Sequence, residues 1–313
     1  MESWGKRRIA FALSFLSDRK GLHMNAKKVY PNYFWFVPLL IYTMIFIIPS
    51  ILGLLYSFTN WTIYSSSKTF CGLDNYKNLL GDSLFRMGFR NTIIFTIFTT
   101  AAKAVIGFAL ALALNAKIPT KNALRTIYYL PAIFSSLIVG VVFRSILMPK
   151  TGLLNTFLGV LSPGLAANDW LGQPSTAMAA VIFVEIWRGA GYCMVLFLAG
   201  LQGISSEYYE AATIDGAGGG QKFKSITAPL MMPTLNTVIS LSIIGGLKVF
   251  DIVIALTKGG PGLSTEVLST TVYKYLGNGA MGTGSAANMC LTVFVVIVFA
   301  VVNYGLGRME VDQ

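Results

Sequence analysis

Long uninterrupted apolar runs are the feature of this 313-residue sequence that most limits its fold. A helix needs about 20 apolar residues to cross the roughly 30 Å of bilayer hydrocarbon. Runs of this length lie near residues 33–58, 91–116, 126–148, 176–202, 230–256 and 284–307. Their residues do not alternate as those of a transmembrane β-strand would, for example from Ile41 to Ile48 and from Leu291 to Val302. We therefore predict an all-α, polytopic membrane protein with six transmembrane helices.

The distribution of charge predicts the orientation of these helices. Only 12% of the residues are charged, against about 25% in soluble domains, which leaves too little polar surface for a water-soluble globule. Lysine and arginine prefer cytoplasmic loops. With the N-terminus inside, the cytosolic segments hold 13 of these residues and the outer loops hold 7. We therefore predict that both termini face the cytosol, and that the net charge of +11 reflects this bias and contact with membrane lipid rather than nucleic acid.

The first 30 residues form a basic segment ahead of the first span. Its apolar stretch from Ile9 to Leu16 runs into Asp18 without a convincing cleavage site, which disfavours a cleaved signal peptide. We interpret the segment as a cytosolic, interfacial amphipathic helix. The predicted organisation is this segment (1–30), a six-helix transmembrane domain (31–307) and a cytosolic tail (308–313).

Clustered catalytic groups and cofactor motifs are missing from the sequence, which argues against an enzyme. His23 is the only histidine, so a paired-histidine zinc site is excluded. The glycines from Gly216 to Gly220 are not followed by Gly-Lys-Ser or Gly-Lys-Thr, so the chain has no recognisable ATP-binding loop. Cys71, Cys193 and Cys290 are widely spaced and indicate neither a zinc site nor a disulfide framework. We expect no catalytic residue, metal or cofactor in this chain.

One long polar stretch, EAATIDGAGGGQKFKSITAP at 210–229, separates two of the most apolar segments. Ser206 is suited to cap a helix with Glu207 in its first turn, where a carboxylate meets the positive end of the helix dipole. Gly216 then ends this helix, and a second short helix is predicted from Gln221 to Thr227. Such a protruding helix pair is shaped to enter a groove on another protein.

The residue spacing in this stretch carries a resemblance. The pattern Glu-Ala-Ala, three residues, Gly, nine residues, Ile resembles the signature loop of permease subunits of bacterial ATP-binding-cassette (ABC) importers, with Ala228 where the family usually has leucine. The resemblance implies that the loop over 203–229 is a coupling helix seated in a cleft of a separate ATPase, which binds ATP and Mg²⁺. The implied coupling residues are Glu210, Ala211, Ala212, Asp215 and Gly216.

The likeness extends over roughly residues 30–307. The segments GLDNYKNLL, WRGAGY, LAGLQGISSEYYEAATIDGAG and FDIVIALTKGGPGLSTEVL together resemble the carbohydrate-uptake branch that includes the maltose and glycerol-phosphate permeases. This implies import of a sugar or oligosaccharide across the bacterial plasma membrane. It also implies three kinds of partner protein: a second homologous permease, two copies of the ATP-binding subunit and an extracytoplasmic solute-binding protein.

The resemblance places the sugar site midway across the membrane, on helices four and five. Gly189 and Tyr192 match positions that contact the sugar in the maltose permease, and an aromatic ring beside a glycine gap offers a stacking platform. Helix five is Asn-rich in the maltose permease, and here the corresponding residues run from Gly245 to Lys248. The predicted substrate-binding residues are Glu185, Arg188, Gly189, Tyr192, Ser242, Gly245 and Lys248.

Four cations fall within predicted spans, where charge is costly and usually faces a cavity or a partner: Lys103, Arg144, Arg188 and Lys248. Arg188 has Glu185 three residues before it, and Lys248 has Asp251 three residues after it, so each cation could be neutralised within its own helix or contact the substrate. The other two cations have no obvious local partner. This excess of cations keeps an acidic sugar or a phosphorylated polyol open as the substrate.

A self-sufficient secondary transporter is the alternative from another class. It needs coupling carboxylates within its spans, and Glu185 is one. That alternative leaves the signature loop at 203–229 unexplained, so we prefer the ABC importer permease.

Overall fold

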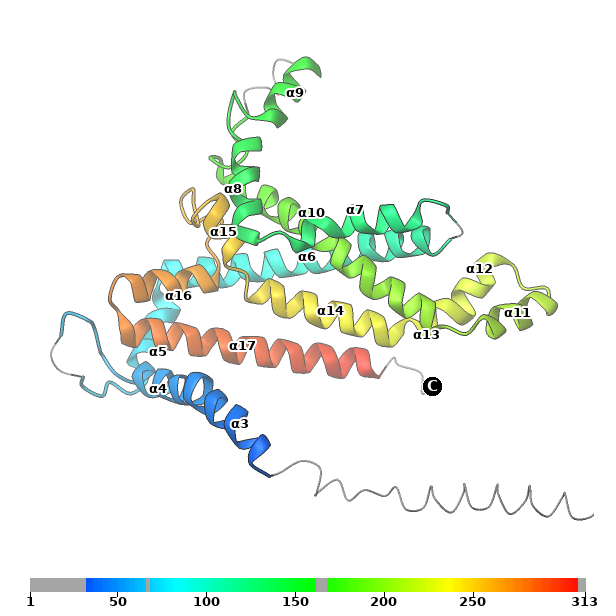
Figure 1. Ribbon diagram of the computed structural model, residues 1–313. Helices are drawn as coiled ribbons and strands as arrows, with labels where there is room; N and C mark the ends of the chain where they lie inside the picture. Colours follow the sequence, from blue (N-terminus) through cyan, green and yellow to red (C-terminus); the bar gives the residue numbers. More distant parts are fainter. Residues whose placement is uncertain (1–31, 66–67, 117, 162–167, 309–313) are drawn as a thin grey trace, which may run out of the picture. The chain divides into compact units, whose positions relative to one another are not determined.

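The structure is a computed structural model that describes residues 32–65, 68–116, 118–161 and 168–308 (Figure 1). Within these ranges the secondary structure is helical, apart from one isolated bridge between Thr59 and Phe70. The predicted N-terminal interfacial helix and nearly all of the predicted tail lie outside the described residues. The chain divides into two parts, residues 1–53 and 54–313, which we describe separately.

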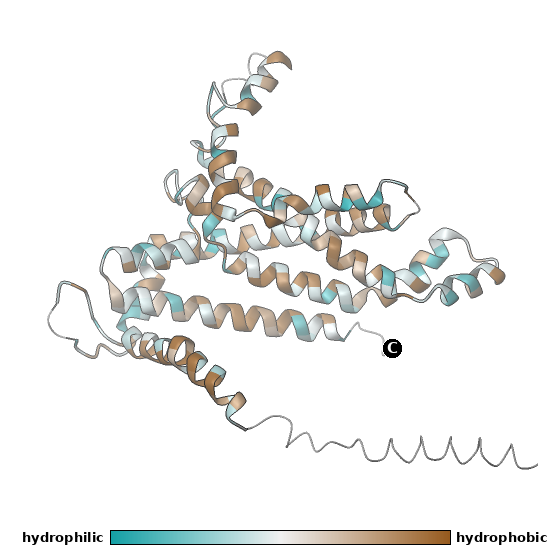
Figure 2. Cartoon of the chain, viewed as in Figure 1, coloured by the Kyte–Doolittle hydropathy of each residue, from teal (hydrophilic) through white to brown (hydrophobic). Residues whose placement is uncertain are grey.

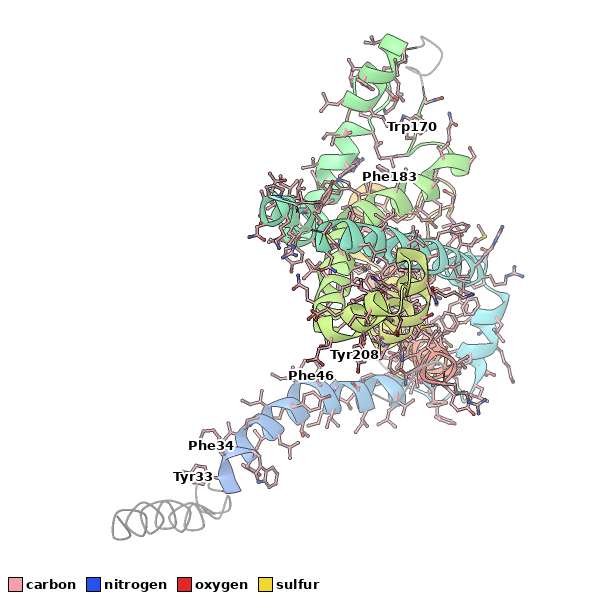
Figure 3. All side chains as sticks on the ribbon, turned by 90° about the vertical axis from the view of Figure 1, so that its right-hand side faces the viewer. Tyr33, Phe34, Phe46, Trp170, Phe183 and Tyr208 are labelled. Atoms are coloured by element: carbon pink, nitrogen blue, oxygen red, sulfur yellow. The ribbon has the colours of Figure 1, made fainter. Side chains whose placement is uncertain are left out.

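The described part of the first segment is one apolar helix with local variations in winding. It consists of η1 (Asn32–Phe34), α3 (Phe36–Tyr42), the π-helical η2 (Thr43–Ile47) and the start of α4 (Ile48–Ser57). Its large apolar side chains are exposed, and Figure 3 shows Tyr33, Phe34 and Phe46 pointing away from the helix axis. A helix that is apolar all round is typical of a membrane span, and Figure 2 shows this stretch as largely hydrophobic.

Among the described residues, four helices are long and apolar enough to cross a membrane: Phe36–Ser57, α6 (Ser83–Asn115), α10 (Pro174–Gly203) and α17 (Met281–Gly307). Two bent pairs bring the possible number of spans to six. The first pair is α7 (Lys121–Ile133) with α8 (Ser136–Ile146), bent by 95°. The second is Gly219–Leu230 with α14 (Met232–Leu247), bent by 59°. The predicted all-helical class is confirmed, and the six-span count holds where each bent pair is one span.

Two predicted spans are therefore not straight helices. Pro131 removes a backbone hydrogen bond from the last turn of α7, and the extended backbone at Phe134 and Ser135 separates α7 from α8. The predicted fifth span, 230–256, stops as a helix at Leu247 and resumes as the short α15 (Asp251–Leu256). Two consecutive glycines, with their low helix propensity, precede this break.

Three apolar clusters hold the second part together. The first joins α6, α8, α10 and α15 around Phe95, Val181 and Val253. The second joins α6, α10 and α14 around Met194 and Val238. The third joins α5 (Asp74–Gly81), α6, α16 (Leu268–Gly277) and α17, and short α9 (Leu153–Leu161) lies beyond α8. Helix α6 belongs to all three clusters, so it is the central helix of this part.

The close contacts between helices fix their relative directions. A Cβ added at Gly107 of α6 would lie 2.7 Å from Cβ of Cys193, so two backbones approach closely at this glycine. Lys103, one turn earlier on α6, contacts Gly189, one turn earlier on α10. Helices α6 and α10 therefore run in the same direction. Helix α14 runs the opposite way along α10, because Gly200 faces Thr234 and Cys193 faces Ser242.

Candidate functional site

A buried carboxylate with two cations lies where α6 crosses α10. Nζ of Lys103 lies 3.3 Å from Oε1 of Glu185. Arg188 donates from Nε to Oε2 (3.1 Å) and from Nη2 to both oxygens (3.0 and 3.2 Å). The side chains of Lys103 and Glu185 are 7% and 9% exposed, and that of Arg188 is 24% exposed. We call this cluster the Lys103–Glu185–Arg188 triad.

The sequence predicted only half of this triad. The pairing of Glu185 with Arg188 within one helix is confirmed by the structure. Lys103 was expected to have no local partner, and its partner is 82 residues away on another helix. No spacing pattern in the sequence signals this contact; in the structure a Cβ at Gly189 would lie 2.5 Å from Cδ of Lys103. The space that was expected to receive a sugar ring beside Gly189 holds the stem of this lysine.

The expected pair between Lys248 and Asp251 is wrong. Their spacing places them on one face only if the helix continues, and α14 ends at Leu247 while α15 begins at Asp251. Both side chains are exposed, and the ion pairs among the described residues do not include them. Arg144 is also exposed and lies in the last turn of α8, where a cation is favoured by the helix dipole.

The seven predicted substrate-binding residues are only partly brought together. Arg188 and Tyr192 are one turn apart on α10, and Tyr192 is 43% exposed. Ser242 is buried, with its Oγ 3.7 Å from Sγ of Cys193, so it joins α14 to α10. Gly245 lies on an exposed position of α14, Lys248 is exposed just after the end of this helix, and a Cβ at Gly245 would meet open space. Of the seven residues, the structure thus joins Glu185 to Arg188 directly, and Lys103 contacts both Glu185 and Gly189.

An apolar cavity among the membrane helices does not suit a sugar. It has a volume of about 550 Å³ and lies between α6, α14 and α17, with Thr96, Ile243 and Phe294 among its lining residues. A sugar site needs several convergent polar groups. None of the residues that line this cavity is charged or belongs to the predicted substrate-binding set.

The sequence analysis missed a second buried carboxylate, in the loop between α15 and α16. Glu266 is fully buried and accepts hydrogen bonds from Nζ of Lys274 (2.5 Å) and Oγ1 of Thr270 (2.8 Å). Gly259 has a positive φ of 88°, and a Cβ there would lie 1.9 Å from Oε2 of Glu266. The glycine of the Gly-Gly-Pro element is therefore needed for a close approach to Glu266.

This loop is anchored on α6 as well. Asn91 donates from Nδ2 to the carbonyl oxygens of Leu263 (3.0 Å) and Ser264 (3.1 Å), and Oγ1 of Thr92 accepts from the backbone of Leu268. Tyr275 of α16 donates a hydrogen bond to Asp82 at the start of α6. Burial, which is the larger cause, and this hydrogen bond both raise the pKa of the Tyr275 hydroxyl. The loop is therefore a fixed structure rather than a loose connection.

The predicted helix pair at 203–229 is present. It consists of α11 (Ser206–Ile214), α12 (Gly219–Lys222), the π-helical η3 (Phe223–Thr227) and α13 (Ala228–Leu230). The capping residue is Ser205 rather than the predicted Ser206, because Oγ of Ser205 accepts from the backbone of Glu207 (3.3 Å). Gly216 ends α11 at a φ of 77°, with the backbone of Ala217 donating to Ala212, as in a Schellman motif.

Two side-chain hydrogen bonds hold this hairpin closed. The hydroxyls of Tyr209 and Thr227 are 2.9 Å apart, and Nζ of Lys222 donates to Oγ1 of Thr213 at 2.8 Å. Figure 1 shows α11 and α12 protruding beyond the ends of α10 and α14. The predicted coupling residues lie on this hairpin: Glu210, Ala211, Asp215 and Gly216 are exposed, and Ala212 is half-buried.

A polar-edged cavity of about 700 Å³ lies at the base of the hairpin. Its lining residues come from the end of α10, the start of α11 and the start of α14, and include Ser205, Tyr208 and Thr234. The junction between the hairpin and helices α10 and α14 therefore contains a cavity.

The chain is similar to a described protein family and to known proteins over most of its length. Residues 103–310 match the family described as "Binding-protein-dependent transport system inner membrane component". The chain is 36% identical to the multiple sugar-binding transport system permease protein MsmF of Streptococcus mutans over 88% of this chain and 94% of that protein. It is 34% identical to the trehalose/maltose transport system permease protein MalF of Thermococcus litoralis over 90% of this chain and 95% of that protein.

A solved structure shows the same fold. The chain is similar to a chain of a bacterial alginate ABC transporter in complex with a periplasmic protein that binds an alginate pentasaccharide. The TM-score is 0.78 at 26% sequence identity, and the match covers 92% of this chain and 98% of that chain.

The triad makes a prediction about stability. Glu185→Met leaves Lys103 and Arg188 as two adjacent cations without their carboxylate, which costs about 3–5 kcal/mol in a buried pair. We expect the melting temperature in detergent, followed by tryptophan fluorescence, to fall by at least about 5 °C. Lys103→Met leaves a one-to-one Glu185–Arg188 pair and should lower it much less. Asp74→Met, which removes an exposed carboxylate paired with Lys77, is the matched control. Equal melting temperatures for Glu185→Met and Asp74→Met would contradict the prediction.

Proposed function

Because this chain belongs to the family of binding-protein-dependent transport system inner membrane components, we propose that it is the membrane-spanning permease subunit of an ABC importer that carries a sugar or oligosaccharide into the cytoplasm. The chain is a translocation subunit, and ATP hydrolysis belongs to a separate protein. The family removes the alternative of a self-sufficient secondary transporter, and Glu185 is already neutralised by two cations of this chain.

The evidence that the substrate is a sugar is the near full-length match to two relatives that are named as sugar permeases. Arg188 and Tyr192 supply chemistry that suits such a substrate. A guanidinium donates hydrogen bonds to hydroxyl oxygens, and an aromatic face stacks on a pyranose ring.

Uptake of a panel of labelled sugars tests this proposal. The complete transporter is expressed with its solute-binding protein in a host that lacks sugar importers, and cells receive radiolabelled maltose, trehalose, an arabinooligosaccharide or alginate pentasaccharide. We expect accumulation of at least one sugar, and its loss when the ATPase carries an inactive ATP site. Accumulation that continues without the ATPase would contradict an ABC importer.

An acidic sugar is a second candidate, favoured by the charge of the triad. Two cations and one carboxylate leave one net positive charge, which is unfavourable within a membrane protein unless it faces water or an anion. The similar solved transporter is described as importing the acidic polysaccharide alginate. In the same uptake panel, greater accumulation of alginate pentasaccharide than of maltose would support an acidic substrate.

The proposed assembly contains a second permease of the same fold, two ATP-binding subunits that hold ATP and Mg²⁺, and an extracytoplasmic solute-binding protein, in a bacterial plasma membrane. We further propose that both termini and the α11–α12 hairpin are cytosolic. The distribution of basic residues supports this orientation, and the helix directions support the number of crossings. The cytosolic loops carry more lysine and arginine, and the shared direction of α6 and α10 requires the α7–α8 segment between them to cross the membrane once.

Cysteine labelling tests the orientation. In a background without Cys71, Cys193 and Cys290, Tyr64→Cys should react with an impermeant maleimide added to intact cells, because this side chain is 81% exposed. Gly219→Cys, at an open position of the hairpin, should react only in inverted vesicles. The reverse pattern would place the hairpin outside and remove its contact with a cytosolic ATPase.

The proposed coupling role of the hairpin rests on its exposed signature residues. We expect Glu210→Lys to abolish sugar uptake because it reverses the charge at the proposed contact with the ATPase. Gly216→Pro should do the same, because proline cannot adopt the φ of 77° that reverses the chain. Membrane insertion, measured by immunoblotting of membranes, should be retained. Glu207→Lys is the matched control on the same helix, outside the signature. Normal uptake by both signature variants would remove the coupling role.

A further inference from the structure

The triad fixes the direction of Arg188 and leaves one edge of its guanidinium free. Nε and Nη2 donate to the two oxygens of Glu185, whereas Nη1 makes no hydrogen bond to another described residue. A guanidinium is planar and rigid, so holding two of its nitrogens fixes where the third one points. Glu185 therefore orients the free Nη1 edge of Arg188.

Glu185 in turn is held from the neighbouring helix. Its Oε1 accepts from both Lys103 and Arg188, its Oε2 accepts from Arg188, and its side chain is 9% exposed. The stem of Lys103 packs against Gly189, which limits the movement of the lysine. The carboxylate is thus occupied on both oxygens and is not available to a sugar hydroxyl.

The free edge of Arg188 lies on the same helix as the exposed ring of Tyr192, one turn away. The Arg188 side chain is 24% exposed and Tyr192 is 43% exposed, whereas Lys103 and Glu185 are buried. We propose that Lys103 is a positioning residue: through Glu185 it directs the Nη1 edge of Arg188 to an oxygen of the sugar that lies against Tyr192. The cation of this pair, and not its carboxylate, contacts the substrate. This inference rests on the proposed function.

A positioning role and a purely structural role predict different behaviour for one variant. Lys103→Met leaves Glu185 and Arg188 as a balanced pair, so a lysine that serves only to neutralise charge is dispensable. A lysine that positions Arg188 is not dispensable, because Glu185 loses one of its two anchors and the guanidinium can turn away from the sugar.

The test uses the complete transporter in proteoliposomes, with its sugar-loaded binding protein. Radiolabelled maltose and alginate pentasaccharide are the probes, and the readout is the amount of sugar imported per ATP hydrolysed. We expect Lys103→Met to lower this ratio by about tenfold, the size of one lost hydrogen bond to a charged group. Lys103→Arg should retain most of it. Lys77→Met, which removes an exposed lysine paired with Asp74, is the matched control and should equal the wild type.

Three results would overturn the inference. The first is a wild-type ratio in Lys103→Met. The second is recovery of the ratio in the double variant Lys103→Met with Glu185→Gln, because that variant lacks both the lysine and the carboxylate through which Arg188 is proposed to be positioned. The third applies where Lys103→Met does not assemble: Arg188→Met leaves a balanced Lys103–Glu185 pair, and a wild-type ratio in that variant shows that Arg188 does not contact the sugar. A wild-type transporter that imports none of the four sugars of the uptake panel instead defeats the proposed function, and the inference fails with it.

Discussion

A carboxylate buried among membrane helices must be neutralised by the protein itself, and Glu185 imposes this condition on the whole second part of the chain. Arg188 lies on the same helix as Glu185, but Lys103 comes from α6, so the second ion pair exists only if α6 and α10 cross at one register. Two glycines make that register possible. Gly189 admits the stem of Lys103, and Gly107, one turn further along α6, lets the two backbones meet at Cys193. Because α6 also contributes to each apolar cluster, the other helices are arranged around this crossing.

The sequence was informative where the determining contacts are local. Apolar length identified the apolar helices, and the Glu-Ala-Ala and glycine spacing identified the hairpin, with the cap of its first helix one residue earlier than predicted and its second helix beginning at Gly219 rather than Gln221. It failed where the determining contact is distant. The partner of Lys103 depends on helix packing, and no spacing rule reaches across 82 residues. The Lys248–Asp251 pair failed because hydropathy continues through 230–256 while the backbone helix stops at Leu247. Apolar length alone cannot distinguish a straight span from a broken one.

The Gly-Gly-Pro loop illustrates a motif whose role became clear only in three dimensions. In the sequence, Gly259 and Gly260 served to relate the chain to a branch of permeases. In the structure, Gly259 is the position where the backbone passes over the buried carboxylate of Glu266, which Lys274 neutralises. The buried carboxylates of Glu185 and Glu266 are stabilised in the same way. Each pairs with a lysine, and a nearby glycine leaves room for the pair. The pattern explains why glycine recurs beside charge in so apolar a chain.

Glu185 and Arg188 of the triad lie on α10, the helix that leads into the hairpin, which bears on how movement travels through the protein. Helix α10 runs unbroken from Pro174 to Gly203, and α11 begins three residues later at Ser206. From Arg188 to the end of α10 is about 22 Å at the helical rise of 1.5 Å per residue, so a displacement of the hairpin is carried to the triad by a stiff rod. Helix α14, at the other end of the hairpin, differs because it breaks after Leu247. We infer that α14 can change its bend at this break while α10 cannot. Since Lys103 binds Glu185 from α6, any movement of α10 must carry α6 with it or separate a buried ion pair, and the second course is strongly unfavourable. We therefore expect helices α6 and α10 to move as one unit, and the chain to change direction between α14 and α15.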